Sequence, residues 1–210
     1  MGSPAQPVVL IVDDEPDIAE TYELWLSDRY QIKIAGSGDE ALSKIDTDVD
    51  VVLLDRMMPG MSGEEVLTEI RTRDIDCRVA MVTAVDPSFD IIEMGFDEYV
   101  VKPPSKERLR ATVEQLVKRG ELNTTYQEYF SLIARQDALQ AEFSPGELAD
   151  SPEYNTLLAQ IEAQESKLKD RLGELNSDAN FIGAIREIMR ESESMNEAEH
   201  TTNNSGEHTQ

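Results

Sequence analysis

The sequence predicts an α/β fold, in which a (βα)5 doubly wound parallel sheet is followed by a small α-helical domain. Two observations predict the sheet. Short β-branched runs alternate with amphipathic stretches up to residue 119, as in repeated βα units. Acidic residues, a threonine and a lysine stand directly after four of these runs. A third observation predicts the helical domain, because beyond Gly120 only helical spacing remains.

Strands and helices are expected to alternate through the first domain. The β-branched runs predict strands at residues 7–12, 31–35, 50–54, 78–82 and 97–101. The amphipathic stretches between and after them predict helices at residues 16–28, 38–46, 63–73, 88–94 and 105–119. Ser105 follows a proline pair and can serve as the N-cap of the last helix.

The region beyond Gly120 is expected to form a helical hairpin. Apolar residues three and four positions apart predict helices over 122–142 and 153–175. The segment Phe143-Ser144-Pro145-Gly146 is interpreted as the turn between them, and Ser151 followed by Pro152 as the start of the second helix.

A third amphipathic stretch, residues 178–190, could cap this hairpin, and the polar residues after it are expected to be disordered. These patterns divide the chain into a tail at 1–6, a sheet domain at 7–119, a helical domain at 120–190 and an acidic, polar tail at 191–210.

The chain is strongly acidic, with a formal net charge of −24 over 210 residues, and acidic residues outnumber basic ones in both expected domains. Such a surface repels nucleic acid phosphates at ordinary salt. Two explanations stay open. One is ordinary acidic solubility, and the other is a salt-loving host, in which molar salt screens the repulsion between surface charges.

Cysteine and histidine usage narrows the possible functions. Cys77 is the only cysteine, which excludes an internal disulfide and a cysteine metal cluster and fits a reducing cytoplasm. The only histidines, His200 and His208, lie in the polar tail. No signal peptide and no apolar run of the ~18 to 20 residues of a membrane span is found, so a cytoplasmic protein is expected.

Five side chains are expected to meet at one edge of the sheet. Asp13 and Asp14 follow the first strand, Asp55 the third, Thr83 the fourth and Lys102 the fifth. The carboxyl ends of parallel strands line one crevice, so these side chains should converge. Taken singly, each is more often a cap, strand or loop residue, but the joint pattern at successive strand ends favours a functional pocket.

The expected pocket has the chemistry of a magnesium and phosphoryl site. Mg²⁺ prefers oxygen ligands, which the carboxylates of Asp13, Asp14 and Asp55 could supply together with the main-chain carbonyl of Met57. One of the aspartates could be a nucleophile that carries a phosphoryl group. Asp55 is favoured because it stands alone at the end of the central strand. The lysine would offer positive charge, and the threonine a hydroxyl donor, to phosphoryl oxygens.

Four motifs then carry a family resemblance, namely IVDDEPD, VVLLDRMMPGMSG, MVTA and DEYVVKPP. Through them residues 7–119 resemble the receiver domain of two-component response regulators, which has a flavodoxin-like fold. The resemblance implies that Asp55 accepts a phosphoryl group from a sensor histidine kinase and that Asp13 and Asp14 hold Mg²⁺.

The same resemblance implies a signalling switch rather than an enzyme. Thr83 would move toward the phosphoryl group, Tyr99 would turn inward with it, and the Lys102–Pro103 peptide bond would be cis. Phosphorylation then biases a two-state domain. The face formed by the fourth helix, the fifth strand and the fifth helix would change its binding preferences, with a homodimer or a downstream protein as the partner.

Residues 121 to about 190 resemble the HalX domain, a small helical domain found after receivers in salt-loving archaea. The resemblance is carried by YFSLIARQDALQAEFSPGELADSPEY. It agrees with the acidic composition and supplies no output activity.

Two alternative functions are weighed against this interpretation. A phosphatase resembling the haloacid dehalogenase family also forms a phosphoaspartate, but its nucleophile lies on the first strand, whereas here the lone Asp55 lies mid-chain. A DNA-binding transcriptional regulator would need a basic recognition segment. The one basic cluster, Lys167, Lys169 and Arg171, stands among acidic residues and is typical of exposed helical ion pairs. Protein interaction is therefore favoured as the output.

Two apolar residues predict a persistent phosphorylated state. Met57 lies two residues after Asp55, and Val85 two residues after Thr83. Neither side chain can orient an attacking water molecule, so hydrolysis should be poorly assisted.

Overall fold

The computed structural model describes residues 6–73, 75–120 and 124–174. Its five strands are parallel and lie in the order β2-β1-β3-β4-β5. They are β1 (Val8–Val12), β2 (Gln31–Ala35), β3 (Val51–Leu54), β4 (Arg78–Thr83) and β5 (Glu98–Val101). This is the doubly wound order of flavodoxin-like folds, and it confirms the predicted fold class.

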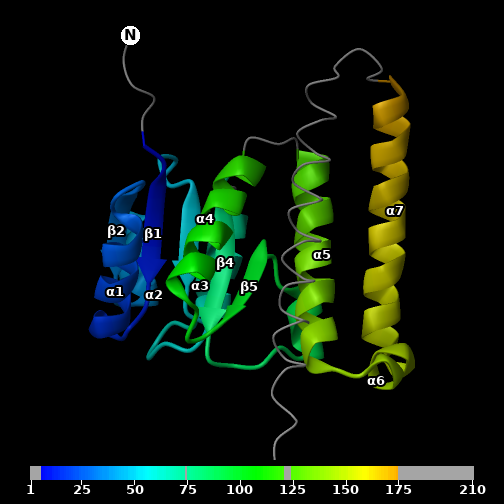
Figure 1. Cartoon of the computed structure of the whole chain (residues 1–210), viewed down its shortest axis with the longest axis horizontal. Coiled ribbons are helices and arrows are strands. Elements are labelled where there is room, and N and C mark those ends of the chain that lie inside the picture. The colour runs from blue at the N-terminus through cyan, green and yellow to red at the C-terminus, as the bar shows by residue number, and fades with distance from the viewer. Residues whose placement is uncertain (1–5, 74, 121–123, 175–210) are drawn as a thin grey trace, which may run out of the picture. The chain divides into compact units, whose positions relative to one another are not determined.

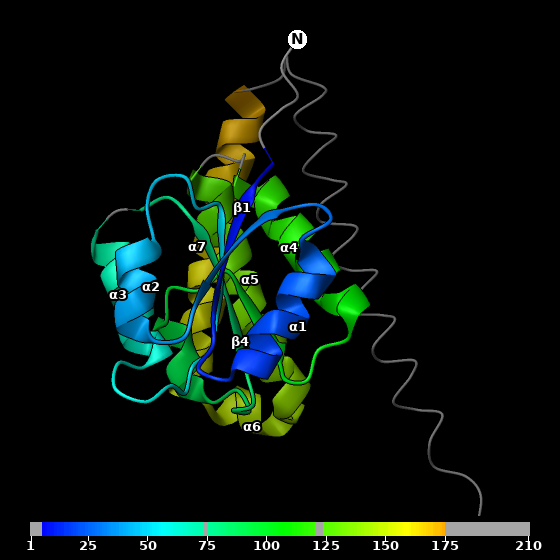
Figure 2. The same cartoon turned by 90° about the vertical axis from the view of Figure 1, so that its left-hand side faces the viewer.

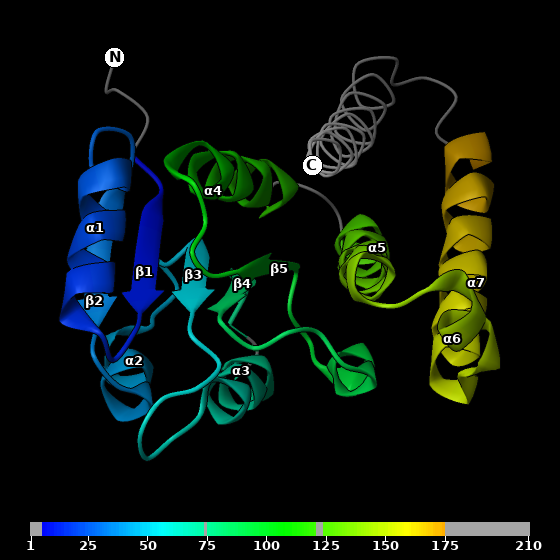
Figure 3. The ribbon, with the colours of Figure 1, turned by 60° about the horizontal axis from the view of Figure 1, so that its bottom comes forward.

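Helices cover both faces of the sheet. They are α1 (Pro16–Leu26), α2 (Gly38–Lys44), α3 (Gly63–Thr72) and α4 (Lys106–Gly120). α1 and α4 lie on one face and α2 and α3 on the other (Figure 2, Figure 3). Every residue of β3 and β4 is buried, which explains their continuous apolar runs, because a central parallel strand has no solvent-facing side.

The segment expected as a helix at residues 88–94 differs from that prediction. It forms a short 3-10 helix, η1 (Phe89–Glu93). The amide of Ile91 donates to the carbonyl of Ser88 at 3.1 Å, and the amide of Met94 to that of Ile91 at 3.1 Å, which is the i to i+3 pattern. Pro87 and Gly95 flank this short segment.

Three helices follow α4, namely α5 (Thr124–Glu142), α6 (Pro145–Asp150) and α7 (Pro152–Glu174). The interpretation of residues 143–146 as a plain turn was wrong, because α6 begins there. Ser144 and Glu147 form a capping box around its first turn, and Pro145 occupies the first helical position, where its missing N–H costs nothing.

α5 and α7 are joined by side-chain hydrogen bonds. The hydroxyl of Tyr154 accepts a hydrogen bond from Gln140 at 2.9 Å, and Gln164 donates to Glu128 at 2.7 Å. α4 is described up to Gly120 and α5 from Thr124 (Figure 1), so the continuity of the helix from Ser105 into the second domain depends on residues outside the described ranges. The expected helix at 178–190, the expected tail at 191–210 and the side chains of Lys169 and Arg171 lie outside the described residues.

One compact unit extends to Glu165, and a second begins at Ser166. The first unit contains the sheet, its covering helices, α5 and α6. The expected domain boundary between residues 119 and 120 lies inside this unit and stays a prediction. Within the described residues, no helix is both long enough and apolar enough to cross a membrane.

Candidate acidic pocket at the carboxyl edge of the sheet

The strand ends bring the five expected residues to one edge of the sheet. β1 ends at Val12, directly before Asp13 and Asp14, and β3 ends directly before Asp55. β4 ends with Thr83. Lys102 follows β5, and its amide donates to the carbonyl of Thr83 at 2.8 Å. β1, β3, β4 and β5 are consecutive neighbours in the sheet, so the positions converge as the strand pattern predicts.

Three carboxylates form the acidic part of the pocket. Carboxylate oxygens of Asp13, Asp14 and Asp55 lie within 4.8 Å of one another. Asp13 and Asp55 are buried, at 3% and 7% exposure. Each also accepts one amide hydrogen bond from the loop that follows it, Asp13 from Glu15 at 3.0 Å and Asp55 from Met57 at 3.2 Å. These bonds fix the direction in which the carboxylates point.

Lys102 balances part of this negative charge. Its Nζ lies 2.7 Å from Oδ2 of Asp13 and 2.7 Å from Oδ2 of Asp55. Burial alone would lower the pKa of Lys102, but the hydrogen bonds that it donates to the two carboxylates outweigh burial and raise the pKa. The ammonium group is therefore held in its charged form. Tyr22 of α1 lies near the same charges, and burial raises its pKa to about 12.

The two residues expected to act as the switch are both buried. Thr83 has 0% exposure, and its Oγ1 accepts a hydrogen bond from the amide of Val85 at 3.3 Å. The Tyr99 side chain points inward, and its hydroxyl donates to the carbonyl of Val85 at 2.7 Å. The loop after β4 thus touches both side chains. The Lys102–Pro103 peptide bond is cis.

The loop after β3 depends on a glycine that the sequence patterns did not single out. The amide of Gly63 donates to the carbonyl of Arg56 at 2.9 Å. A Cβ atom at Gly63 would lie 2.1 Å from the carbonyl oxygen of Asp55. Gly63 therefore permits a close approach of α3 to the backbone that carries Asp55. The side chain of Met57, in the same loop, is 65% exposed.

Arg56 is a second residue that the sequence patterns missed. It follows Asp55 directly, and its side chain is only 8% exposed. Its guanidinium group pairs with Glu64 of α3 at 2.6 Å and with Asp90 of η1. Burial opposes its charge, but the bonds to these acids raise the pKa of Arg56. In the sequence, the only indication of this role is that a charged residue stands next to a strand predicted to be buried.

The pocket fits a hard divalent cation. Mg²⁺ prefers oxygen ligands and often takes one or two carboxylates together with water and phosphate oxygens. The three carboxylates offer such oxygens within a small space, and one lysine leaves part of their charge uncompensated. Asp13, Asp14 and Asp55 are the residues that could hold the ion.

Comparison with known families agrees with this geometry. The family model of the response regulator receiver domain matches residues 9–114, and the model of the HalX domain matches residues 118–185. The fold and the pocket together define a signalling receiver. The chain belongs to the response regulator receiver family, with a HalX domain after the receiver.

Individual proteins are also similar to this chain. A Haloferax volcanii protein called "Putative transcriptional regulator" is 40% identical over 188 residues, which cover 89% of this chain and 32% of that protein. The sensory transduction protein RegX3 of Mycolicibacterium smegmatis is 38% identical over 120 residues, which cover 55% of this chain and 52% of that protein. The matched residues therefore span 32% of the first relative's length and 52% of the second's.

A solved structure supports the fold. The CheY-like response regulator receiver domain protein of Methanospirillum hungatei JF-1 matches with a TM-score of 0.52 and 26% identity, over 56% of this chain and 98% of that chain. The family and these relatives support a two-component regulator.

Proposed function

We propose that this chain is a phosphorylation switch, in which Asp55 accepts a phosphoryl group from a phosphohistidine of a sensor kinase. The observation that carries the proposal is the Lys102 ammonium group, 2.7 Å from both Asp13 and Asp55. A buried cation beside a buried carboxylate suits a nucleophile that must receive a negatively charged group. The proposal includes the sensor kinase as the phosphodonor, a single stoichiometric phosphorylation of the chain instead of catalytic turnover, and a cytoplasmic location.

The transfer needs one bond to form and one to break. An oxygen of the Asp55 carboxylate attacks phosphorus, the P–N bond of the phosphohistidine breaks, and its electron pair returns to the imidazole nitrogen. Lys102 stabilises negative charge on the phosphoryl oxygens. When bound, Mg²⁺ would neutralise charge on the phosphoryl group, held by Asp13, Asp14, Asp55 and the main-chain carbonyl of Met57.

The switch would follow from contacts that exist only in the phosphorylated state. Thr83 would move toward the phosphoryl group and donate its hydroxyl hydrogen to a phosphoryl oxygen. This movement of Thr83 leaves the space that an inward Tyr99 occupies. The inward Tyr99, whose hydroxyl bonds to the carbonyl of Val85, has the position that the phosphorylated state would favour. The free energy of the new contacts then shifts the population of the two states.

The output has two candidates. Interaction with another protein or a second copy is supported by the acidic surface, which disfavours nucleic acid. Direct DNA binding is supported by the name of the Haloferax volcanii relative, which refers to transcriptional regulation. We favour interaction.

The test measures the molecular mass of the protein by light scattering in molar KCl with Mg²⁺. The wild type and Asp55→Asn are compared with and without beryllofluoride, which mimics a phosphoryl group. A mass that doubles only in the wild type with the mimic supports Asp55 as the switch and dimerisation as the output. Failure of the wild type to bind the mimic would overturn the role of Asp55. Retention of the wild type on duplex DNA at molar salt would overturn the preferred output.

A further inference from the structure

Helix α5 is packed against η1 and β5, on the side of the receiver where the switch residue Tyr99 lies. The hydroxyl of Ser131 donates to the carbonyl of Phe96. The guanidinium group of Arg135 donates to the carbonyl of Ile92 at 3.2 Å and to Ser131 at 2.9 Å. It also lies 5.7 Å from the centre of the Phe96 ring, within the range of a cation–π contact.

Further contacts extend this packing at both ends of α5. Phe130 lies under the guanidinium group of Arg119, 4.8 Å from its ring centre. Phe89 of η1 stacks on Phe143, just after α5, with ring centres 4.7 Å apart. Tyr126 and Phe130 are buried, at 3% and 4% exposure. The contact is thus aromatic as well as polar.

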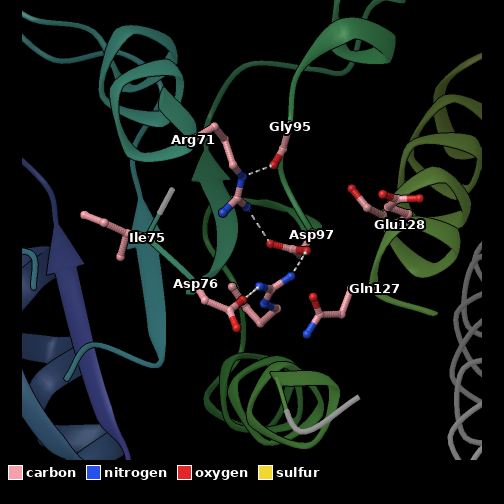
Figure 4. Close-up of a pocket in the computed structure, with 9 residues that line it drawn as sticks. Arg71, Ile75, Asp76, Gly95, Asp97, Gln127 and Glu128 are labelled. Carbon is pink, nitrogen blue, oxygen red and sulfur yellow. Dashed lines mark hydrogen bonds and ion pairs between the residues drawn. The ribbon is translucent and has the colours of Figure 1, made fainter. Parts of the chain in front are cut away.

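The backbone that receives α5 is held from the other side. Arg71 of α3 donates to the carbonyl of Gly95 at 2.9 Å and pairs with Asp97 at 2.8 Å (Figure 4). Arg78 pairs with Asp97 at 3.3 Å. These bonds fix the residues on either side of Phe96, whose carbonyl receives Ser131.

A pocket that is open to solvent lies beside this contact. A cavity of about 490 Å³ lies between these arginines and α5, and Gln127, Glu128 and Ser131 of α5 line it. Figure 4 shows Glu128 and Gln127 across the cavity from Arg71 and Asp97. Beside this pocket α5 packs less closely on the receiver than it would in a filled core. A small change in the position of α5 therefore costs less free energy there.

Two routes connect this contact to the phosphoryl site. Arg56, next to Asp55, pairs with Asp90 of η1. Tyr99 packs on Phe96 with ring centres 5.6 Å apart, and Phe96 contacts both Ser131 and Arg135 of α5. Phe96 therefore contacts both Tyr99 and α5.

We propose that α5 is the intrachain partner of the switch face, and that docking of α5 on η1 and Phe96 and phosphorylation of Asp55 stabilise each other. This inference rests on the proposed function, because it assumes that Asp55 is the phosphorylated residue. An inward Tyr99 packs against the ring of Phe96 and so supports the surface that Ser131 and Arg135 bind. Phosphorylation favours the inward Tyr99 and so favours docking. Coupling between two sites is reciprocal, so docking also favours phosphorylation.

Because the coupling is reciprocal, substitutions in α5, far from the acidic pocket, should change the affinity of that pocket for a phosphoryl mimic. Isothermal titration measures the affinity of the full chain for beryllofluoride in the presence of Mg²⁺, for the wild type, Asp55→Asn, Arg135→Gln and Ser131→Ala. Arg29→Gln is the matched control, because Arg29 is exposed and pairs with Glu114 at 3.6 Å on α4. We expect Arg135→Gln to weaken binding by about fivefold or more, Ser131→Ala to weaken it less, and Arg29→Gln to leave it unchanged.

Hydrogen–deuterium exchange of the same samples gives the second readout. Beryllofluoride should slow the exchange of amides in residues 89–94 and 126–139 of the wild type and leave Asp55→Asn unchanged. Equal titrations of the wild type and Asp55→Asn would overturn the proposed function itself. Binding that depends on Asp55 but is the same in Arg135→Gln and Ser131→Ala, with unchanged exchange in α5, would overturn the coupling alone.

Discussion

Lys102 and Asp55 form a buried ion pair, with Nζ and Oδ2 2.7 Å apart and with side-chain exposures of 9% and 8%. The same ammonium group binds Asp13 at an equal distance. One cation therefore compensates two carboxylates that solvent hardly reaches. Such a pair is expensive to break, since each remaining charge would be left without a partner in a poorly hydrated place.

Lys102→Met should destabilise the protein, because it leaves the carboxylates of Asp13 and Asp55 uncompensated. We expect a loss of about 3 kcal/mol in the free energy of unfolding in EDTA, and a smaller loss in Mg²⁺, which binds only the folded pocket. Urea unfolding measures both. Lys106→Met is the control, because Lys106 is exposed at the start of α4. Equal losses for the two variants would contradict this account of the pair.

Asp14→Asn should weaken Mg²⁺ binding while the fold is kept, because Asp14 is only partly buried and belongs to the carboxylate cluster. We expect a loss of affinity of about tenfold, the scale of a lost partner in a metal site. Isothermal titration with MgCl₂ measures it. Asp17→Asn is the control, because it removes the same charge from the first turn of α1. If Asp17→Asn lowers the Mg²⁺ affinity as much as Asp14→Asn does, the effect comes from the overall negative charge and not from a specific Mg²⁺ site.

Gly63→Ala should disturb the loop that carries Asp55. The added Cβ atom would meet the carbonyl oxygen of Asp55 at 2.1 Å, so the backbone must move. We expect a loss of about 1 to 3 kcal/mol in the free energy of unfolding, together with slower labelling of Asp55 by a small phosphodonor. Gly146→Ala in α6 meets no atom within 4 Å and should leave labelling unchanged.

The phosphorylated state should persist in the wild type and become short-lived when polar groups replace Met57 and Val85. In Met57→Asn with Val85→Glu, we expect hydrolysis to accelerate by about tenfold or more, because positioned polar groups assist the attack of water. Decay of radiolabelled protein measures the rate. Leu24→Asn also replaces an exposed apolar residue, 75% exposed on α1, and should keep the wild-type rate. An unchanged rate in the double variant would remove the basis of this prediction.

Cys77 should make stability depend on pH in the alkaline range. Burial raises the pKa of its thiol to about 11, so the unfolded chain loses this proton first. The contribution to stability is complete below the ordinary thiol pKa of 9.0 and is lost as the pH rises toward 11, by roughly 2 to 3 kcal/mol. Urea unfolding at pH 8 and pH 11 should show a larger decrease for the wild type than for Cys77→Ala. Parallel decreases would mean that the thiol does not contribute.

The sequence was sufficient for the strands and for the pocket, and the reason is geometric. Asp13, Asp55 and Lys102 each follow a strand directly, and a parallel sheet brings those positions together whatever the intervening chain does. The strand bounds of the structure differ from the predicted ones by a residue at most. The roles assigned to these residues stay predictions.

Contacts between distant, irregular segments could not be predicted in this way. The pair of Arg56 and Asp90 spans 34 residues and depends on the path of η1, and the amphipathic pattern at residues 88–94 predicted a helix there without its position relative to Asp55. The packing of Ser131 and Arg135 depends on where α5 lies, and a sequence pattern gives only the polar character of those positions. α6 was within reach, because Ser144 and Glu147 have the spacing of a capping box, and that signal was overlooked.

Helix α5 packs against β5, and this packing would be lost if the receiver were fused to another output domain without α5. β5 is the last strand of the sheet, and an open strand edge invites pairing with foreign chains. A chimaera joined after Gly120 would uncover that edge together with the aromatic surface around Phe96. A replacement output domain with a helix at the same place would restore this cover, and an exchange that keeps α5 extends to Glu142, the end of α5.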